Sequence, residues 1–278
     1  MKKKLIIIPS IFIFILIFFF SPLYPMVKSY GIMYPYSFKH KTDSILYKKD
    51  IDLNIKGGLY TEKKDWYPFV MTYTASDDFS KYTGRDFDLT VLYNFGHFKL
   101  KDEASSFYDP TSPYFSSFYG GYVIQNKKNP NDKFGFLENG DLDINDISNL
   151  TEFDQNYLVL SSIGCPKEER IFEIDAVNII EDVDYMKLSG WTKVNANIKT
   201  NSPMHKFRDD QRGYIQYGKP ISRFYDGKDF PVIDLKGRIY AKYIDEYKIT
   251  VVMFIVSPSL DTINECDDEI LSHSTINN

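Results

Sequence analysis

Residues 249–256 read ITVVMFIV, a run of eight apolar or β-branched residues without a charge. The run is too short to cross a bilayer, for which a helix needs about 20 residues. A strand that is buried on both faces of its sheet has a continuous apolar sequence of this kind. We therefore expect this run to lie in a central, buried strand, predicted over residues 239–256.

Segments of similar composition, rich in Val, Ile, Tyr, Phe and Thr, recur along the chain. Strands are predicted at residues 43–55, 67–75, 87–100, 117–125, 157–163, 170–180, 191–198, 214–225 and 239–256, with turns such as Asn139-Gly140 and Lys236-Gly237. The helices predicted are short, at residues 144–153 and 182–188. The fold class is therefore mainly β, a β-rich α+β chain built on an antiparallel sheet or sandwich.

The N-terminal segment has the composition of a membrane-targeting helix. Three lysines at positions 2–4 precede residues 5–20, which are apolar except for one Pro and one Ser. A helix of this length reaches about 24–30 Å, close to the thickness of a bilayer's hydrocarbon core. Residues 1–24 are predicted to be a single-pass anchor in the cell membrane, or a signal peptide whose cleavage gives a secreted protein. In both cases the bulk of the chain is expected to be extracytoplasmic, with membrane contact through residues 5–24.

The rest of the chain divides into a tether and a domain. Residues 25–42 contain Pro and Gly without a periodic pattern, so they are predicted to be a tether. Residues 43–278 are predicted to form the β-rich extracytoplasmic domain, with a subdivision near residues 126–152 as the alternative to one continuous unit. The chain has 33 Lys and Arg against 38 Asp and Glu, a formal net charge of −5, which argues against a nucleic-acid partner.

Residues 141–152 carry oxygen-bearing side chains at the spacing of a twelve-residue calcium loop. The candidate ligands, at loop positions 1, 3, 5, 9 and 12, are Asp141, Asp143, Asn145, Asn149 and Glu152. Position 6, where such a loop needs Gly for its sharp turn, is Asp146. Two interpretations therefore stay open, a weak calcium site and a solvated loop or helix cap. No other cofactor is expected.

The only two cysteines are Cys165 and Cys266. Outside the cytoplasm, a pair of cysteines favours a disulfide, and closing a loop of about 100 residues would stabilise the fold by about 4–5 kcal/mol. The alternatives are two buried thiols or a catalytic one. In the catalytic case Cys165 attacks an acyl group, His97 or His205 protonates the leaving group, and Arg170 supports the oxyanion.

Aromatic residues are abundant, with 22 Tyr and 22 Phe, and they are densest in residues 107–122. Tyr and Phe offer rigid, amphipathic contact area, which suits a groove for a peptide or a sugar. The candidate ligand-contacting residues are Tyr108, Tyr114, Phe115, Tyr119 and Tyr122. The alternative is a turn whose rings cover one end of a β core.

Three functions are compatible with these patterns. The leading one is a membrane-tethered, extracytoplasmic binding or assembly module at the cell envelope, with a peptide, a glycan or an envelope protein as ligand. The second is an exported cysteine-dependent hydrolase or transpeptidase that uses Cys165 with His97 or His205. The third is a calcium-stabilised structural surface protein. The sequence leaves open whether the protein is an enzyme.

Overall fold

The computed structural model describes residues 11–19, 35, 37–55, 71–94, 111–161, 165–201 and 232–277. Residues 11–19 are helical, and the elements after them begin with a short helix that follows the segment at 37–43. In chain order they are α3 (Ile45–Lys48), β1 (Asp52–Asn54), β2 (Met71–Thr74), α4 (Ser76–Thr83), β3 (Phe87–Asn94), β4 (Phe118–Asn126), α5 (Ile144–Glu152), η2 (Phe153–Leu160), η3 (Lys167–Glu169), β5 (Phe172–Tyr185), β6 (Leu188–Thr200), β7 (Ile233–Ile244), β8 (Ile249–Ser257), α6 (Leu260–Cys266), η6 (Asp267–Leu271) and β9 (Thr275–Asn277). The segments η2 and η6 are π-helical, and each continues an α-helix without a break.

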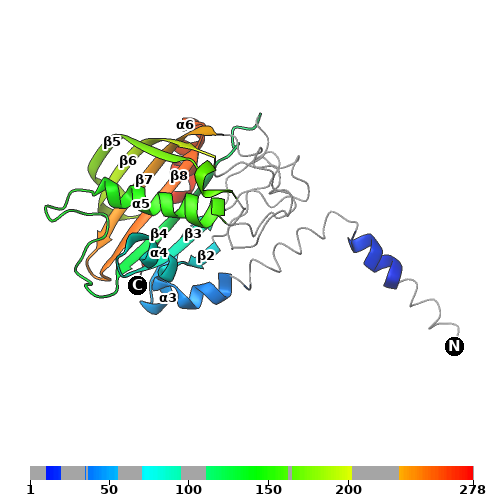
Figure 1. Cartoon of the computed structure of the whole chain (residues 1–278), viewed down its shortest axis with the longest axis horizontal. Helices are drawn as coiled ribbons and strands as arrows, with labels where there is room; N and C mark the ends of the chain where they lie inside the picture. Colours follow the sequence, from blue (N-terminus) through cyan, green and yellow to red (C-terminus); the bar gives the residue numbers. More distant parts are fainter. Residues whose placement is uncertain are drawn as a thin grey trace.

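Seven of the strands form one antiparallel sheet in the order β2-β3-β4-β8-β7-β6-β5, and β1 pairs with β9 in a separate two-stranded sheet. After β4 the chain runs through α5 and η2 to the far edge of the sheet. It then returns strand by strand from β5 to β8, which pairs with β4. Figure 1 shows α5 lying across one face of the sheet. The β-rich, antiparallel character expected from the sequence is confirmed.

Strand β8 is the fourth of the seven strands, and all nine of its residues are buried. Its side chains alternate between two cores, with Val252 and Phe254 in one and Val251 and Met253 in the other. The predicted central strand is therefore confirmed for residues 249–256. The prediction over 239–256 merged two strands, because residues 245–248 form the turn between β7 and β8.

Helices cover the sheet on both faces. The α5 face carries side chains such as Leu89 and Tyr122, which form a core with Phe79 of α4 and Leu150 of α5. The α6 face carries side chains such as Trp191 and Tyr240, which form a second core with helices α3, α6 and η6. The polar stretch at 126–152 packs on the α5 face through Phe134.

Two predicted elements are wrong and one is only partly right, each for a local reason. Residues 157–160 are not a strand, because η2 extends α5 to Leu160; a short apolar run does not distinguish a strand from a buried helix. Of the strand predicted at 43–55, only β1 at 52–54 is formed, and residues 45–48 are the helix α3, which Ser44 caps by accepting a hydrogen bond from the backbone N–H of Tyr47. Residues 182–188 are not a helix but the end of a hairpin, in which Met186 and Lys187 both have positive φ. A two-residue hairpin turn normally uses Asn or Gly at such positions, so the sequence carried no turn signal.

The turn predicted at Lys236-Gly237 is also wrong, because both residues lie inside β7. An added Cβ on Gly237 would lie 2.7 Å from Cδ1 of Ile198, so the glycine permits close packing rather than a turn. The strand predicted at 214–225 lies outside the described residues.

The helix at residues 11–19 exposes its apolar side chains. Eight of its nine residues are between 41% and 71% exposed. Within the described parts of the chain, no helix combines the length and the apolar character that a membrane crossing requires.

Candidate functional site

The centre of the candidate site is the buried carboxyl of Asp154, at the start of η2 on the α5 face. Asp154 is 0% exposed. The hydroxyl of Tyr122 donates a hydrogen bond to its Oδ2 at 2.6 Å, and the side-chain amide of Gln155 donates to the same oxygen at 2.8 Å. Burial raises the pKa of Asp154 to about 8, while the bond from Gln155 acts in the opposite direction. At neutral pH the group is therefore mainly a neutral carboxylic acid.

Local helix geometry places this carboxyl. Asp143 precedes helix α5 and caps it by accepting a hydrogen bond from the backbone N–H of Asn145. The change from α-helical to π-helical turns falls at Phe153, next to Asp154. Such π-helical insertions are frequent at functional sites. The partner side chain comes from the sheet, because Tyr122 lies in β4 and points to the α5 face.

A narrow apolar cleft adjoins this cluster, between the sheet and the α5–η2 helix. It has a volume of about 30 Å³, room for about one water molecule. Its lining combines the polar side chains of Tyr122, Thr151, Gln155 and Thr200 with the apolar ones of Phe118, Phe172, Ile198, Leu235, Ile239, Phe254 and Val256. The cleft thus accepts a water molecule or the tip of an apolar group.

The α6 face holds a second buried carboxyl, that of Asp267, the first residue of η6. Tyr185 donates a hydrogen bond to Oδ1 at 2.7 Å, and Tyr240 donates to Oδ2 at 2.5 Å. The guanidinium of Arg238 forms an ion pair with Oδ2 at 2.9 Å. The rings of Tyr185 and Tyr240 stack with centroids 3.6 Å apart. Burial, followed by the charge of Asp267, raises the pKa of Tyr185.

A larger hollow lies beside α3 and β1, next to the predicted tether. Its volume is about 410 Å³, which is within the range of small-molecule sites. Lys41, Asp50 and Asp52 contribute charged groups of both signs to its lining. Two residues of the 37–43 segment, Ser37 and Lys41, line it.

The predicted calcium stretch is mostly helix. Asn145, Asn149 and Glu152 lie in α5, and Asp143 caps that helix. Asp141 accepts a hydrogen bond from the side chain of Asn139. Among the described residues, no group of three or more His, Cys, Asp or Glu side chains is arranged to hold a metal ion. The helix-cap interpretation fits this geometry, and calcium binding stays a prediction.

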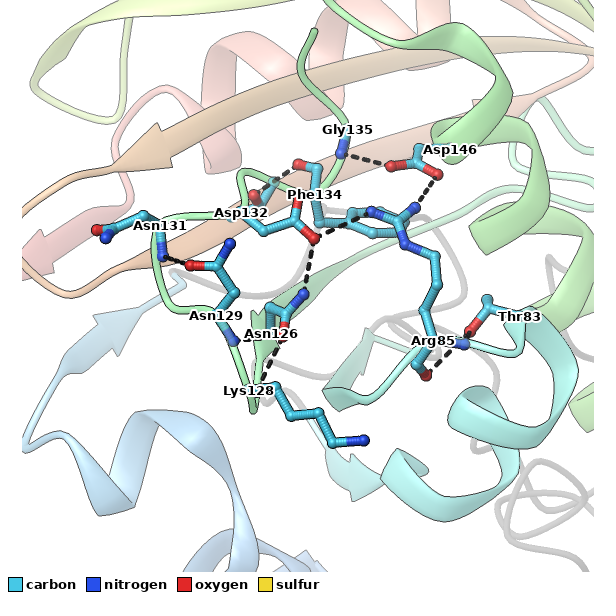
Figure 2. Close-up of polar contacts among 11 residues, drawn as sticks. Thr83, Arg85, Asn126, Lys128, Asn129, Asn131, Asp132, Phe134, Gly135 and Asp146 are labelled. Carbon is cyan, nitrogen blue, oxygen red and sulfur yellow. Dashed lines mark hydrogen bonds and ion pairs between the residues drawn. The ribbon is translucent and has the colours of Figure 1, made fainter. Parts of the chain in front are cut away.

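The residue at loop position 6, Asp146, has a structural partner instead of a glycine turn. Figure 2 shows the guanidinium of Arg85 between Asp146, at 2.7 Å, and Asp132, at 3.5 Å. Asp146 also accepts a hydrogen bond from the backbone N–H of Gly135. The guanidinium of Arg85 lies over the ring of Phe87, 4.5 Å from its centroid. This cluster fixes the 126–146 segment to the sheet.

The two cysteines are not joined by a disulfide, and each is 1% exposed. Cys266 ends α6 in the core of the α6 face, whereas Cys165 follows η2, the helix of the α5 face. The predicted bridge is therefore not formed, because the residues belong to different layers. Burial, followed by the nearby charge of Asp267, raises the pKa of the Cys266 thiol.

The catalytic arrangement around Cys165 is not assembled among the described residues. Arg170 donates hydrogen bonds to the backbone carbonyls of Cys165 and Asn156, so its guanidinium holds the chain after η2. His97 and His205 lie outside the described residues.

The candidate aromatic residues do not share one surface. Tyr119 and Tyr122 are buried on opposite faces of β4, in the α6-face and α5-face cores. Tyr114 and Phe115 are half-buried in the turn before β4, and the hydroxyl of Tyr114 donates a hydrogen bond to Glu265 at 3.0 Å. Tyr108 lies outside the described residues. The part that is described serves the core, in agreement with the alternative stated above.

Sequence reasoning missed both buried carboxyls. Asp154 and Asp267 stand among other acidic residues, and their partners are distant in sequence: Tyr122 is 32 residues from Asp154, and Tyr185 is 82 residues from Asp267. No local signal marks them, since Asp154 is followed by Gln and Asn, and Asp267 by Asp and Glu.

Comparison of the chain with protein families, with curated proteins and with solved structures finds no match.

Proposed function

We propose that the protein is a membrane-tethered, extracytoplasmic binding or assembly module of the cell envelope. The observation that carries this proposal is the helix at residues 11–19, whose Ile, Leu and Phe side chains are exposed. Exposure of apolar surface to water costs about 25 cal/mol per Å², so a lipid environment is the favourable one for this helix. The β-rich domain that follows would then be held at the membrane surface.

Burial of the thiols favours binding over cysteine catalysis. A nucleophilic cysteine needs access to its substrate and a depressed pKa. Cys165 and Cys266 are buried, and burial raises the pKa of Cys266. The hydrolase or transpeptidase assignment therefore receives no support from the described residues, and we favour a domain that acts through its surfaces.

The topology can be tested in cells with one engineered cysteine. The native thiols are buried, so Asp245→Cys, in the exposed turn between β7 and β8, supplies a selective label site. We expect a membrane-impermeant maleimide to label this variant in intact cells and the chain to stay in the membrane pellet after alkaline extraction. The unsubstituted chain is the labelling control. Labelling that requires lysis of the cells would overturn the proposal.

The proposed anchor can be tested by placing charged residues in the helix at 11–19. The double variant Phe14→Lys/Ile17→Lys introduces two ammonium groups there. Because each central lysine costs about 2.5–3.5 kcal/mol on membrane insertion, this variant should be released from the membrane pellet. Tyr47→Lys, at an exposed position of α3, is the matched control and should remain in the pellet. Equal retention of both variants would argue against the anchor.

A further inference from the structure

Strand β5 forms one edge of the seven-stranded sheet and pairs only with β6 among the described strands. It is 14 residues long, and residues 177–182 are exposed on both faces. A long edge strand has a row of backbone N–H and C=O groups available for pairing with another strand. The β5 edge is therefore a geometrically suitable place for strand addition.

The opposite edge of the same sheet is protected. Strand β2 has only four residues, and the backbone N–H of Thr72 donates a hydrogen bond to the side chain of Ser37. The hydroxyl of Thr74 donates to the backbone carbonyl of His40. The segment at 37–43 thus covers β2, whereas no described strand pairs with the outer edge of β5.

The exposed side chains of β5 combine apolar groups with acids. Val177 is 62% exposed, Ile179 43% and Ile180 40%. The strand contains no Lys or Arg, and its five acidic residues are Glu173, Asp175, Glu181, Asp182 and Asp184. Glu173 lies opposite Lys199 of β6, so the acidic excess is strongest in the half of the strand nearer the hairpin.

A hollow of about 490 Å³ lies beside the start of this edge. Strands β5, β6 and β7 line it, with Glu173, Asp175 and Asp234 as acids and Lys199 and Lys236 as bases. This space is sufficient for a long side chain that projects from an added strand. The acids on its rim favour a basic side chain over an acidic one.

We propose that the β5 edge accepts an added strand from a partner protein, in an extended segment that alternates Lys or Arg with apolar residues. The backbone of the partner extends the sheet, its apolar side chains cover Val177 and Ile179, and its basic side chains pair with the carboxylates of β5.

A second copy of this chain is a poor occupant, because two β5 strands bring ten carboxylates together without a base. The register of β5 with β6 shifts between Ala176 and Asn178, between Ile180 and Val183 and between Val183 and Tyr185. Since the last two shifts fall together near the hairpin, the added strand is confined to residues 172–180.

The binding test uses the full chain in detergent micelles and three ten-residue probe peptides. The first alternates Lys and Val, the second alternates Glu and Val, and the third is the Lys–Val peptide with every second backbone nitrogen methylated. We expect the Lys–Val peptide to bind. We expect the methylated peptide, which has the same charge but cannot complete the ladder, and the acidic peptide to bind at least about tenfold more weakly, a difference of about 1.4 kcal/mol. Equal binding of the methylated peptide, or no binding of the Lys–Val peptide, would overturn strand addition.

Variants locate the site. Glu173→Lys/Asp175→Lys should weaken binding of the Lys–Val peptide about tenfold. The control Asp245→Lys/Asp261→Lys makes the same change in net charge away from β5 and should bind normally. Circular dichroism of both variants checks that they fold, and salt dependence of the wild-type affinity gives an independent measure of the charge pairing. Equal weakening by the control, or a β5-mediated dimer in sedimentation, would contradict the proposal. It goes beyond the membrane assignment, since peptide binding in micelles is independent of where the chain resides in the cell.

Discussion

The two faces of the sheet hold carboxyls in the same structural position but in different electrostatic surroundings. Asp154 and Asp267 each lie at the junction where an α-helix continues as a π-helical segment. Asp154 accepts a hydrogen bond from one tyrosine of the sheet, and Asp267 accepts hydrogen bonds from two. On the α6 face, Arg238 adds a positive charge to Asp267. On the α5 face, two neutral side chains, those of Tyr122 and Gln155, donate hydrogen bonds to Asp154.

This difference shows that the partners of a buried carboxyl, more than its burial alone, decide how the group contributes to the stability of the fold. An ion pair with its hydrogen bonds satisfied keeps a carboxylate charged inside a protein, and removal of one partner leaves the other charge uncompensated. A carboxyl with neutral partners instead retains its proton, and its contribution to stability then depends on pH. The α6 face should therefore respond most to loss of charge, and the α5 face most to a change of pH.

The largest effect is expected from Asp267→Asn. The variant leaves the guanidinium of Arg238, whose side chain is 13% exposed, without its carboxylate. The free energy of unfolding should fall by about 3–5 kcal/mol, measured by chemical denaturation of the full chain. Asp268→Asn changes the exposed neighbouring acid and should alter stability by no more than about 0.5 kcal/mol. A loss below about 1 kcal/mol for Asp267→Asn would mean that the ion pair does not hold the α6 face together.

The second prediction concerns pH and Asp154→Asn. The folded-state pKa of about 8 lies above the ordinary value of 3.8, so the unfolded chain loses this proton first as the pH rises. The stability due to this group is complete below pH 4 and declines up to about pH 8, by as much as about 1.4 kcal/mol per pH unit. The amide cannot ionise, so the variant should lack this decline. It should resemble the wild type near pH 4 and be the more stable protein above pH 8.

The measurement is the difference in unfolding free energy between wild type and Asp154→Asn from pH 4 to pH 9. A matched variant of an exposed acid, Asp268→Asn, controls for the change in net charge. Parallel pH curves for wild type and Asp154→Asn would show that Asp154 is already ionised in the folded protein.

The third prediction compares the tyrosines on the two faces. Tyr122→Phe removes a hydrogen bond to a neutral acid, and Tyr240→Phe removes one to a charged acid; both variants keep the ring. Bonds to neutral groups contribute about 0.5–1.5 kcal/mol and bonds to charged groups about 1.5–3 kcal/mol. At pH 6 the loss in unfolding free energy should be larger for Tyr240→Phe. The reverse order would refute the assignment of the charged carboxyl to the α6 face.

The sheet could be predicted from the sequence better than the buried carboxyls. A strand depends on the pattern of neighbouring residues, whereas each carboxyl site depends on contacts between segments that are distant in sequence. The uncharged, mainly apolar run at 249–256 predicted that β8 is buried, and the residues of α5 themselves predicted that helix. The pairing of Tyr122 with Asp154 arises only when α5 and η2 cross the sheet, which no local pattern encodes. The π-helical turns have no period of their own in the sequence, and this is why residues 157–163 resembled a strand. The predicted aromatic surface depends on the same kind of information. Tyr119 and Tyr122 belong to one aromatic run in the sequence, but in the sheet their side chains enter two different cores.

The smallest effects are expected at the caps of the two helices that lead into these carboxyls. Asp143 accepts a hydrogen bond from the backbone N–H of Asn145 at 2.9 Å, and Ser259 accepts one from Thr262 at 3.4 Å. Replacement of an N-cap residue by Ala costs about 1 kcal/mol, so Asp143→Ala should lose about that amount and Ser259→Ala less, because its bond is longer. Thermal melts with calcium and with a chelator separate the two roles of Asp143. A cap acts equally in both solutions, whereas a loss seen only with calcium would assign Asp143 to a metal site.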